Sequence, residues 1–263
     1  MRKKPFNFLK SLSIKINKFY KKESKKGVII NNKSKNKKNF NPVTNFDKSF
    51  EKLIRNSISK SFPLDSIMGE EFKDKSLSNS YKWSIDPIDG TKAFIKGLPS
   101  WSNLVGLMLN GKSIIGLANF PELSRFYLSD NKNSYLFINK KKQKIKSSNK
   151  NNLKKAKIVC SFQGNIKKLK KNNLIKKLEK SLIILKYDAL SYCSLAEGKI
   201  DVVIETNLKP YDVIPLIPII KNAGGCISGW RAEPAEKGGN IVASSNRKLH
   251  KKILRLIKSN TKK

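Results

Sequence analysis

The chain has 263 residues, 38% of them hydrophobic, so it can bury a substantial core as one compact unit. Lysine and arginine total 56 against 19 acidic residues, a net charge of +37, but the lysines are mixed with asparagine and isoleucine throughout; this indicates compositional drift and solvated surface rather than a nucleic-acid-binding patch. Three cysteines without C-x-x-C spacing and a single histidine argue against a zinc site, a disulfide framework and a Ser-His-Asp hydrolase.

The same features predict a cytoplasmic protein with no membrane partner. No apolar run approaches the ~20 residues that cross a bilayer, and the basic N-terminus lacks a signal-like apolar core. The cysteines are typical of small buried hydrophobes in a reducing compartment.

The first 61 residues predict two amphipathic helices separated by a polar loop. Residues 31–41 are almost all Asn, Lys and Ser and indicate a mobile loop. Asp47 stands near the start of the second helix, where it either caps that helix or binds a metal. The apolar positions that recur at helical spacing are Phe8, Leu9, Leu12, Ile16, Phe19 and Tyr20 in the first helix and Phe50, Leu53, Ile54 and Ile58 in the second.

Two acidic features follow these helices. A short apolar stretch, 66–69, ends in Glu70 and Glu71, and adjacent acids in a strand point to opposite faces, so at most one aims into a site. Asp86 and Asp89 then straddle Pro87, which stiffens the turn.

The residues after this acidic turn suit a phosphate. Gly90 allows the backbone to approach a ligand closely, and Thr91 opens a helical turn with free N–H groups. Carboxylates beside such amides suit a metal-bound phosphate, although Asp, Pro and Gly also make ordinary surface turns. Spacing alone leaves these two readings equal.

The remainder of the N-terminal half predicts a sheet. Asn110-Gly111 between two apolar runs, 104–109 and 113–120, is a strong hairpin signal, and 126–128 predicts a further strand. Residues 137–157 are rich in lysine and asparagine and predict the boundary between two halves, about 1–136 and about 158–263.

Strands and helices alternate in the C-terminal half, which indicates an α/β arrangement. The predicted strands are 158–161, 182–185 and 202–205, and the predicted helices are 174–182 and 190–196. A last helix follows Asp212, which is placed either to cap it or to bind a metal. Pro215 falls in the tolerated first turn, Pro218 predicts a kink, and Gly224 predicts the C-terminal stop.

Taken together, the ordered acidic motifs resemble those of the inositol monophosphatase family of metal-dependent phosphatases. The resemblance spans roughly residues 5–255, and segments 92–101, 187–188 and 208–212 are most similar to its histidinol-phosphatase branch. Lys37 to Asp47 matches the upstream motif in part, with Asn39, Asn41, Phe46 and, further on, Gly229 departing from the family pattern. The matching motifs are Gly69-Glu70-Glu71, Trp83 to Thr91, Tyr211-Asp212 and Ala223-Gly224-Gly225.

The resemblance implies a layered α/β/α/β sandwich acting as a single phosphatase unit, 1–263, with two or three Mg²⁺ ions, the third put in doubt by Asn39. One ion would be held by Glu70, Asp86 and the backbone carbonyl of Ile88, and a second by Asp86, Asp89 and Asp212. In this scheme Glu70 and Thr91 orient the attacking water, and the Gly90 and Thr91 amides cradle the phosphate. No protein nucleophile is needed, which agrees with the single histidine.

The resemblance also implies substrate-selecting residues. Glu205 matches a ligand for a substrate hydroxyl, and Asp188 matches the acid that faces the substrate's amino group, although a helix cap remains the alternative for Asp188. The expected activity is hydrolysis of the small phosphorylated substrate L-histidinol phosphate by a homodimer. The alternatives are an inositol 1-phosphate or nucleotide 3′-phosphate substrate and, in another class, a basic nucleic-acid-binding protein with a decayed site.

Overall fold

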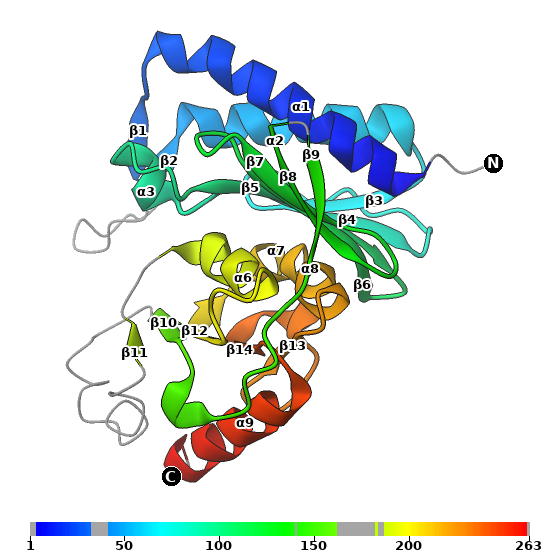
Figure 1. The fold of residues 1–263 in the computed structure, drawn as a ribbon. Helices are drawn as coiled ribbons and strands as arrows, with labels where there is room; N and C mark the ends of the chain where they lie inside the picture. Colours follow the sequence, from blue (N-terminus) through cyan, green and yellow to red (C-terminus); the bar gives the residue numbers. More distant parts are fainter. Residues whose placement is uncertain (1–3, 33–41, 140, 162–181, 184–186, 262–263) are drawn as a thin grey trace.

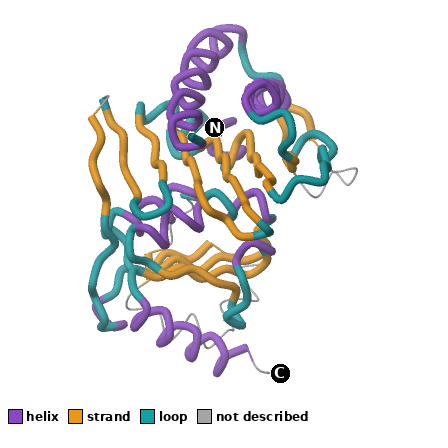
Figure 2. Tube along the Cα trace, turned by 90° about the vertical axis from the view of Figure 1, so that its right-hand side faces the viewer, coloured by secondary structure: helices purple, strands orange, loops and turns teal. Residues whose placement is uncertain are grey.

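Five layers of helices and sheets make up the computed structural model, which describes residues 4–32, 42–139, 141–161, 182–183 and 187–261. In Figure 1, α1 and α2 cover the outer face of a large sheet, three shorter helices separate this sheet from a smaller one, and α9 covers the far side. Figure 2 shows the same stacking from the side. The predicted α/β/α/β layering is confirmed, with α9 as an additional outer layer.

The seven-stranded sheet belongs to the N-terminal half, and its order follows the sequence, β3-β4-β5-β6-β7-β8-β9. Only β3 and β4 are parallel; the other pairs are antiparallel. Asn110 and Gly111 both have positive φ and form the predicted hairpin. The strands are β3 Ser66–Gly69, β4 Tyr81–Asp89, β5 Ser102–Leu109, β6 Lys112–Phe120, β7 Arg125–Ser129, β8 Ser134–Ile138 and β9 Lys141–Ile145.

Helices α1 (Pro5–Glu23) and α2 (Asn45–Ser61) form as predicted. The second helix begins slightly earlier than expected, because Thr44 is its N-cap and Asp47 is its third residue. The Asp47 carboxylate accepts hydrogen bonds from the Thr44 amide and hydroxyl, each at 2.6 Å. The capping role predicted as one alternative for Asp47 is therefore present.

The smaller sheet has the order β11-β10-β12-β14-β13. Helices α6, α7 and α8 lie between the two sheets (Figure 1). The predicted helix 174–182 and most of the predicted loop 31–41 lie outside the described residues. The remaining elements are β10 Ile158–Ser161, β11 Leu182–Ile183, β12 Val202–Leu208, β13 Cys226–Gly229, β14 Gly239–Ser244, α6 Asp188–Ala196, α7 Pro210–Val213, α8 Leu216–Asn222, α9 Arg247–Thr261, α3 Thr91–Ile95, the β1–β2 pair Ile30–Asn32 and Pro42–Thr44, and the 3₁₀ turns Ser24–Lys26, Leu153–Lys155 and Ala235–Lys237.

Apolar side chains fill the spaces between the layers. The large sheet is buried on both faces, so successive residues of one strand enter different cores: Val105 packs with α1 and α2, whereas Leu104 packs with α6 and α8. A third core lies between the small sheet and α9. The acidic end of β4 is thus embedded between two packed layers.

A break between α7 and α8 replaces the single helix expected after Asp212. Helix α7 begins at Pro210, and Pro215 is the N-cap of α8. Proline has no N–H and clashes with the preceding turn, which ends α7 before Pro215. Pro218 lies in the first turn of α8, where an N–H is not needed, so the predicted kink occurs at Pro215 instead.

Two glycines let this break pack directly on the large sheet. Gly106 of β5 pairs with Gly116 of β6, and Pro215 lies against both. A Cβ added at Gly116 would lie 1.7 Å from the Pro215 carbonyl oxygen. The Ser113 hydroxyl also donates to the Ile214 carbonyl at 2.6 Å. Together these contacts fix the position of α7, and therefore of Asp212, relative to the large sheet.

The first sheet continues beyond residue 136, where sequence analysis placed the end of the N-terminal half. Lys141–Ile145 forms β9, an edge strand whose lysines are exposed, and lysine-rich composition is typical of such edges. The chain crosses to the second layer after Ile145.

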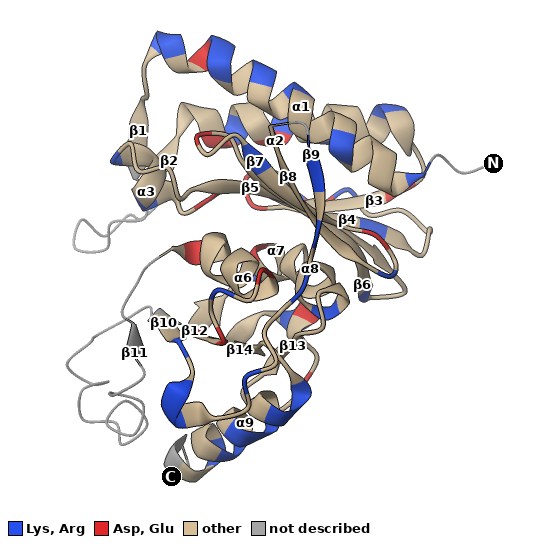
Figure 3. Cartoon of the chain, in the orientation of Figure 1, with Lys and Arg blue, Asp and Glu red and all other residues tan. Residues whose placement is uncertain are grey.

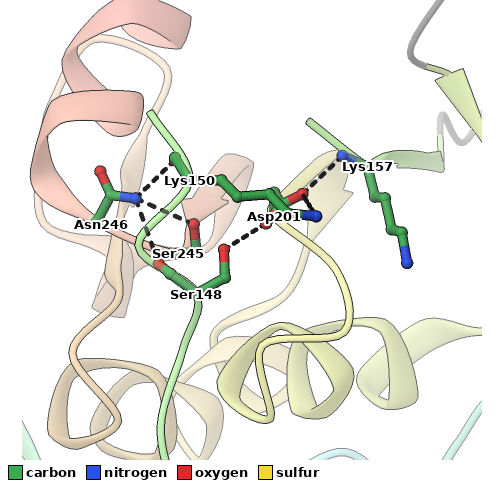
Figure 4. A network of polar contacts seen from close by, with 6 residues as sticks. All are labelled: Ser148, Lys150, Lys157, Asp201, Ser245 and Asn246. Carbon is green, nitrogen blue, oxygen red and sulfur yellow. Dashed lines mark hydrogen bonds and ion pairs between the residues drawn. The ribbon is translucent and has the colours of Figure 1, made fainter. Parts of the chain in front are cut away.

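Buried Asp201 holds this crossing segment in place (Figure 4). Its carboxylate accepts hydrogen bonds from the Ser148 hydroxyl and, at 2.8 Å, from the Lys157 amide. The side-chain amide of Asn246 donates to the carbonyls of Ser148 and Lys150 at 3.3 and 2.9 Å. The crossing segment is therefore tied to the second sheet and to the start of α9.

The basic residues lie mainly on the outer surfaces. Figure 3 shows lysine and arginine along α1 and α9, the two outer helical layers. All six basic residues of α9 are exposed: Arg247, Lys248, Lys251, Lys252, Arg255 and Lys258. Among the described residues, no helix is both long and apolar enough to cross a bilayer.

Candidate active site

Two carboxylates are brought together by the pairing of β3 and β4. The strands are parallel, with Gly69 opposite Ile85. The next residues, Glu70 and Asp86, are therefore level with each other at the same end of the two strands. Asp86 is 2% exposed, whereas Glu70 is half-buried. The sheet register alone thus places two acids, 16 positions apart in the chain, side by side.

The turn after Asp86 is held by its own polar groups. The Ile88 amide donates to the Asp86 carboxylate at 3.0 Å, and the Thr91 hydroxyl donates to the Ile88 carbonyl at 3.2 Å. Gly90 adopts a left-handed conformation, with φ of 80° and ψ of 43°, and caps the short helix α3. Glycine takes this conformation without steric cost. Pro87, Ile88 and Thr91 are therefore fixed relative to Asp86 and Asp89.

A chain of side-chain amides, buried at Asn103 and Asn119, supports this turn, and sequence analysis missed it. The Asn103 side-chain amide donates to the Pro87 carbonyl at 2.6 Å. Asn119 in turn donates to Asn103 at 3.0 Å and to Asn17 of α1 at 2.8 Å. The available signal was polar asparagine within otherwise apolar strands, because a buried amide needs hydrogen-bond partners.

Asp212 faces the strand residues from α7. It is the third residue of that helix rather than its N-cap, and its carboxylate accepts a hydrogen bond from the Lys209 amide at 2.7 Å. Asp212 therefore does cap a helix, as one of its two predicted roles required, but it does so from the third position of α7. Helix α7 packs against β4, and the Asp212 charge acts on Asp86 at the end of that strand.

The start of α6 closes the site from the second half. The Ala189 amide donates to the Asp89 carboxylate at 2.8 Å, and the Ser102 hydroxyl donates to the same oxygen at 3.3 Å. The Asp188 carboxylate lies against Gly90, since a Cβ added at Gly90 would lie 2.7 Å from its oxygen. Asp188 itself has a φ of 40°, uncommon outside glycine.

Glu205 belongs to the same acidic group. It is 3% exposed and lies on β12, near the Tyr192 hydroxyl of α6. Burial, followed by the Glu205 charge, raises the Tyr192 pKa. The structure therefore brings together carboxylates from both halves: Glu70, Asp86, Asp89, Asp188, Glu205 and Asp212.

These carboxylates raise one another's affinity for protons. Burial raises the pKa of Asp86, and the charges of Glu70, Asp89 and Asp212 add to the effect. Burial and the Asp188 charge likewise raise the pKa of Asp89. Burial also raises the pKa of Asp212 to about 6, against the lowering effect of the hydrogen bond from the Lys209 amide. Clustered like charges of this kind are stabilised by a bound cation.

The donor atoms fit a hard divalent cation. They are carboxylate oxygens and the Ile88 carbonyl, and Mg²⁺ prefers oxygen ligands. As they stand, no three His, Cys, Asp or Glu side chains within the described part of the chain are grouped to hold one ion. Mg²⁺ commonly takes only one or two carboxylates together with water and substrate phosphate.

In this layered α/β protein the carboxylates gather from β4 of the large sheet, β12 of the small sheet and the short helices between them. The class of proteins with this arrangement includes metal-dependent hydrolases. The chain matches the inositol monophosphatase family over residues 4–262, and it belongs to that family. The family's enzymes are generally metal-dependent, and this chain is a phosphoric monoester hydrolase.

Curated relatives agree with the family assignment, and a solved structure shares the fold. The chain is 29% identical over 223 residues to a histidinol-phosphatase of Chlorobaculum parvum, covering 84% of this chain and 85% of that protein. It is 30% identical to a fructose-1,6-bisphosphatase/inositol-1-monophosphatase of Aquifex aeolicus, covering 87% and 85%. The fold is similar to that of the extragenic suppressor protein suhB from Bartonella henselae, with a TM-score of 0.82, 20% identity and coverage of 96% and 97%.

Proposed function

We propose that this protein hydrolyses L-histidinol phosphate to L-histidinol and phosphate in a Mg²⁺-dependent reaction. The observation that carries the substrate assignment is the position of Asp188, whose carboxylate lies against Gly90 at the turn between the metal-site acids and α3. An anionic group beside the phosphate position suits an amino alcohol phosphate, whose ammonium group it would pair with. The Chlorobaculum parvum histidinol-phosphatase supports the same substrate.

Each acidic residue has a proposed part in this reaction. Glu70, Asp86, Asp89 and Asp212, with the Ile88 carbonyl, would hold the cations. When bound, Mg²⁺ neutralises phosphate oxygens, acidifies water and stabilises the leaving alkoxide.

The chain's own groups orient the reactants. The Thr91 hydroxyl donates a hydrogen bond to the Ile88 carbonyl at 3.2 Å. This hydroxyl and Glu70 would position the attacking water. The Gly90 and Thr91 amides at the start of α3 would donate to the phosphate. The Ala189 amide holds the Asp89 carboxylate in a fixed orientation, and Glu205 would accept a hydrogen bond from a substrate hydroxyl.

A second substrate, inositol 1-phosphate, is supported by the Aquifex aeolicus relative and by Glu205, which suits a polyol. A decayed site in a nucleic-acid-binding protein is disfavoured, because the acids gather from both halves of the chain. Loss of function would be expected to leave at least one of them displaced or replaced.

The experiment compares kcat/KM for histidinol phosphate and inositol 1-phosphate with Mg²⁺ present, in the wild type and in Asp188→Asn. We expect wild type to favour histidinol phosphate. The Asn variant should lose at least tenfold on that substrate through KM and much less on inositol 1-phosphate. Faster turnover of inositol 1-phosphate by the wild type would refute the substrate assignment while leaving the phosphatase activity intact.

A further inference from the structure

Two residues of α2, Glu51 and Arg55, lie one helical turn apart beneath the segment that carries Glu70. Glu51 has no exposed surface, and Arg55 Nε donates to its Oε1 at 2.7 Å. A carboxylate at this depth is costly unless its oxygens are paired and hydrogen-bonded. The further hydrogen bonds of the pair, and its close contact with Gly69, are made with the backbone on both sides of Glu70.

On the C-terminal side, the pair satisfies the backbone after Glu70. The Glu71 amide donates to Glu51 Oε2 at 2.7 Å, and the Phe72 amide donates to Oε1 at 3.3 Å. Arg55 Nη2 donates to the Phe72 carbonyl at 3.0 Å. The carboxylate therefore receives N–H groups, while the guanidinium donates to the neighbouring carbonyl. This combination fixes both the position and the orientation of the segment.

On the N-terminal side, contact is made at Gly69. A Cβ added there would lie 2.1 Å from Glu51 Oε1 and 2.9 Å from Arg55 Nη2. Glycine at this position lets the end of β3 approach the ion pair. The chain on both sides of Glu70 thus meets the same pair: Gly69 lies against it, and Glu71 and Phe72 are hydrogen-bonded to it.

We propose that the Glu51–Arg55 pair is a positioning device that aims the Glu70 carboxylate at the cation site. Neither side chain is a catalytic residue, because both act through the backbone of Gly69, Glu71 and Phe72. The inference rests on the proposed function, since it assigns Glu70 to that site. Residues that orient metal ligands typically change metal affinity or activity by about 10–100-fold when replaced.

The test is Mn²⁺ binding, measured from the loss of the free-ion EPR signal, together with phosphate release. Glu51→Gln keeps the side-chain volume but places an NH₂ group against one of the N–H donors that the Glu51 carboxylate now accepts. We therefore expect Mn²⁺ affinity to fall about tenfold or more. Arg55→Lys keeps the charge and loses the planar fork, and we expect a smaller loss in the same direction. Because Arg55→Lys is the milder change, it keeps the test decisive if Glu51→Gln folds poorly.

Asp201→Asn is the matched control. Asp201 is also a buried carboxylate that accepts a hydrogen bond from a backbone amide, but it lies in the second half, at the crossing segment. We expect it to lower the unfolding temperature without changing Mn²⁺ affinity. A double variant, Glu51→Gln with Glu70→Gln, should bind Mn²⁺ no more weakly than Glu70→Gln alone, because an effect transmitted through Glu70 disappears when Glu70 is changed.

The outcomes separate the two claims. Weaker Mn²⁺ binding in Glu51→Gln but not in Asp201→Asn, lost in the Glu70→Gln background, supports the positioning role. Wild-type Mn²⁺ affinity in folded Glu51→Gln and Arg55→Lys overturns that role and leaves the phosphatase proposal standing. Absence of both Mn²⁺ binding and phosphate release in the wild type overturns the proposed function itself.

Discussion

The contact between Pro215 and the glycine pair of the large sheet gives the sharpest prediction, for Gly116→Ala. A Cβ at Gly116 would lie 1.7 Å from the Pro215 carbonyl oxygen and 2.7 Å from its carbonyl carbon, both backbone atoms. Cβ atoms essentially never approach other atoms closer than 3.0 Å, so the sheet and the α7–α8 break must separate by about 1.3 Å.

The displacement reaches the site because Asp212 lies three residues before Pro215. Overpacking of this kind costs about 1–3 kcal/mol of stability. A shift of about 1 Å in a catalytic group costs on the order of 10²-fold in rate. We therefore expect Gly116→Ala to fold with lower stability and to lose about 10- to 100-fold in kcat.

Gly111→Ala is the matched control, from the tip of the same β5–β6 hairpin. Gly111 has a φ of 75° and no neighbour within 4 Å of an added Cβ, so alanine there strains the turn without pushing on α7. The measurements are phosphate release and urea unfolding for both variants. If Gly116→Ala keeps a kcat within twofold of that of Gly111→Ala, the contact does not set the position of Asp212.

Two further predictions concern buried polar groups. Asn103→Ala removes the donor to the Pro87 carbonyl and should lower the free energy of unfolding in urea by about 1–3 kcal/mol, with a fall in kcat. Asn17→Ala, at the outer end of the amide chain, should lower kcat far less. Equal effects of the two variants on kcat would contradict a role for the amide chain in holding the turn. Burial lowers the pKa of His250 to about 4 from 6.5. As the pH falls below 6.5, the unfolded state therefore binds a proton that the folded state does not. This residue should make the protein about 2 kcal/mol less stable at pH 5 than at pH 7. His250 is the single histidine of the chain, so its imidazole NMR signals report this pKa directly; a measured pKa near 6.5, or an unchanged pH slope in His250→Asn, would contradict the prediction.

The sequence carried enough information for the first two helices and for the β5–β6 hairpin, whereas α9, β8, β13 and β14 were not predicted. Hydrophobic periodicity predicted α1 and α2, and Asn110-Gly111 predicted the β5–β6 hairpin, because both depend on local chain geometry. The lysine-rich strand β9 was taken for part of a boundary, since an exposed edge strand has little hydrophobic pattern. The break at Pro215 was placed at Pro218, because the position of a proline within a helical turn decides whether it interrupts the helix.

The acidic motifs of the site were visible in the sequence, but their supports were not. Glu70 and Asp86 become neighbours through strand register, which follows from the pairing of β3 with β4 rather than from local sequence. The contact of Asp188 with Gly90 depends on how the two halves pack. Gly106 and Gly116 look like ordinary strand glycines until Pro215 is placed against them.

Asp89→Asn tests most directly whether the gathered carboxylates form a divalent-metal site for phosphate ester hydrolysis. Asparagine has the same shape and still accepts the Ala189 amide, so the fold is retained while one charge is lost. The measurement is Mg²⁺-dependent phosphate release from histidinol phosphate by the wild type and by this variant, with circular dichroism to confirm folding. We expect the wild type to release phosphate only with Mg²⁺ present, and Asp89→Asn to lose nearly all of this activity. Wild-type turnover in the folded variant would show that these carboxylates do not form the metal site of the reaction.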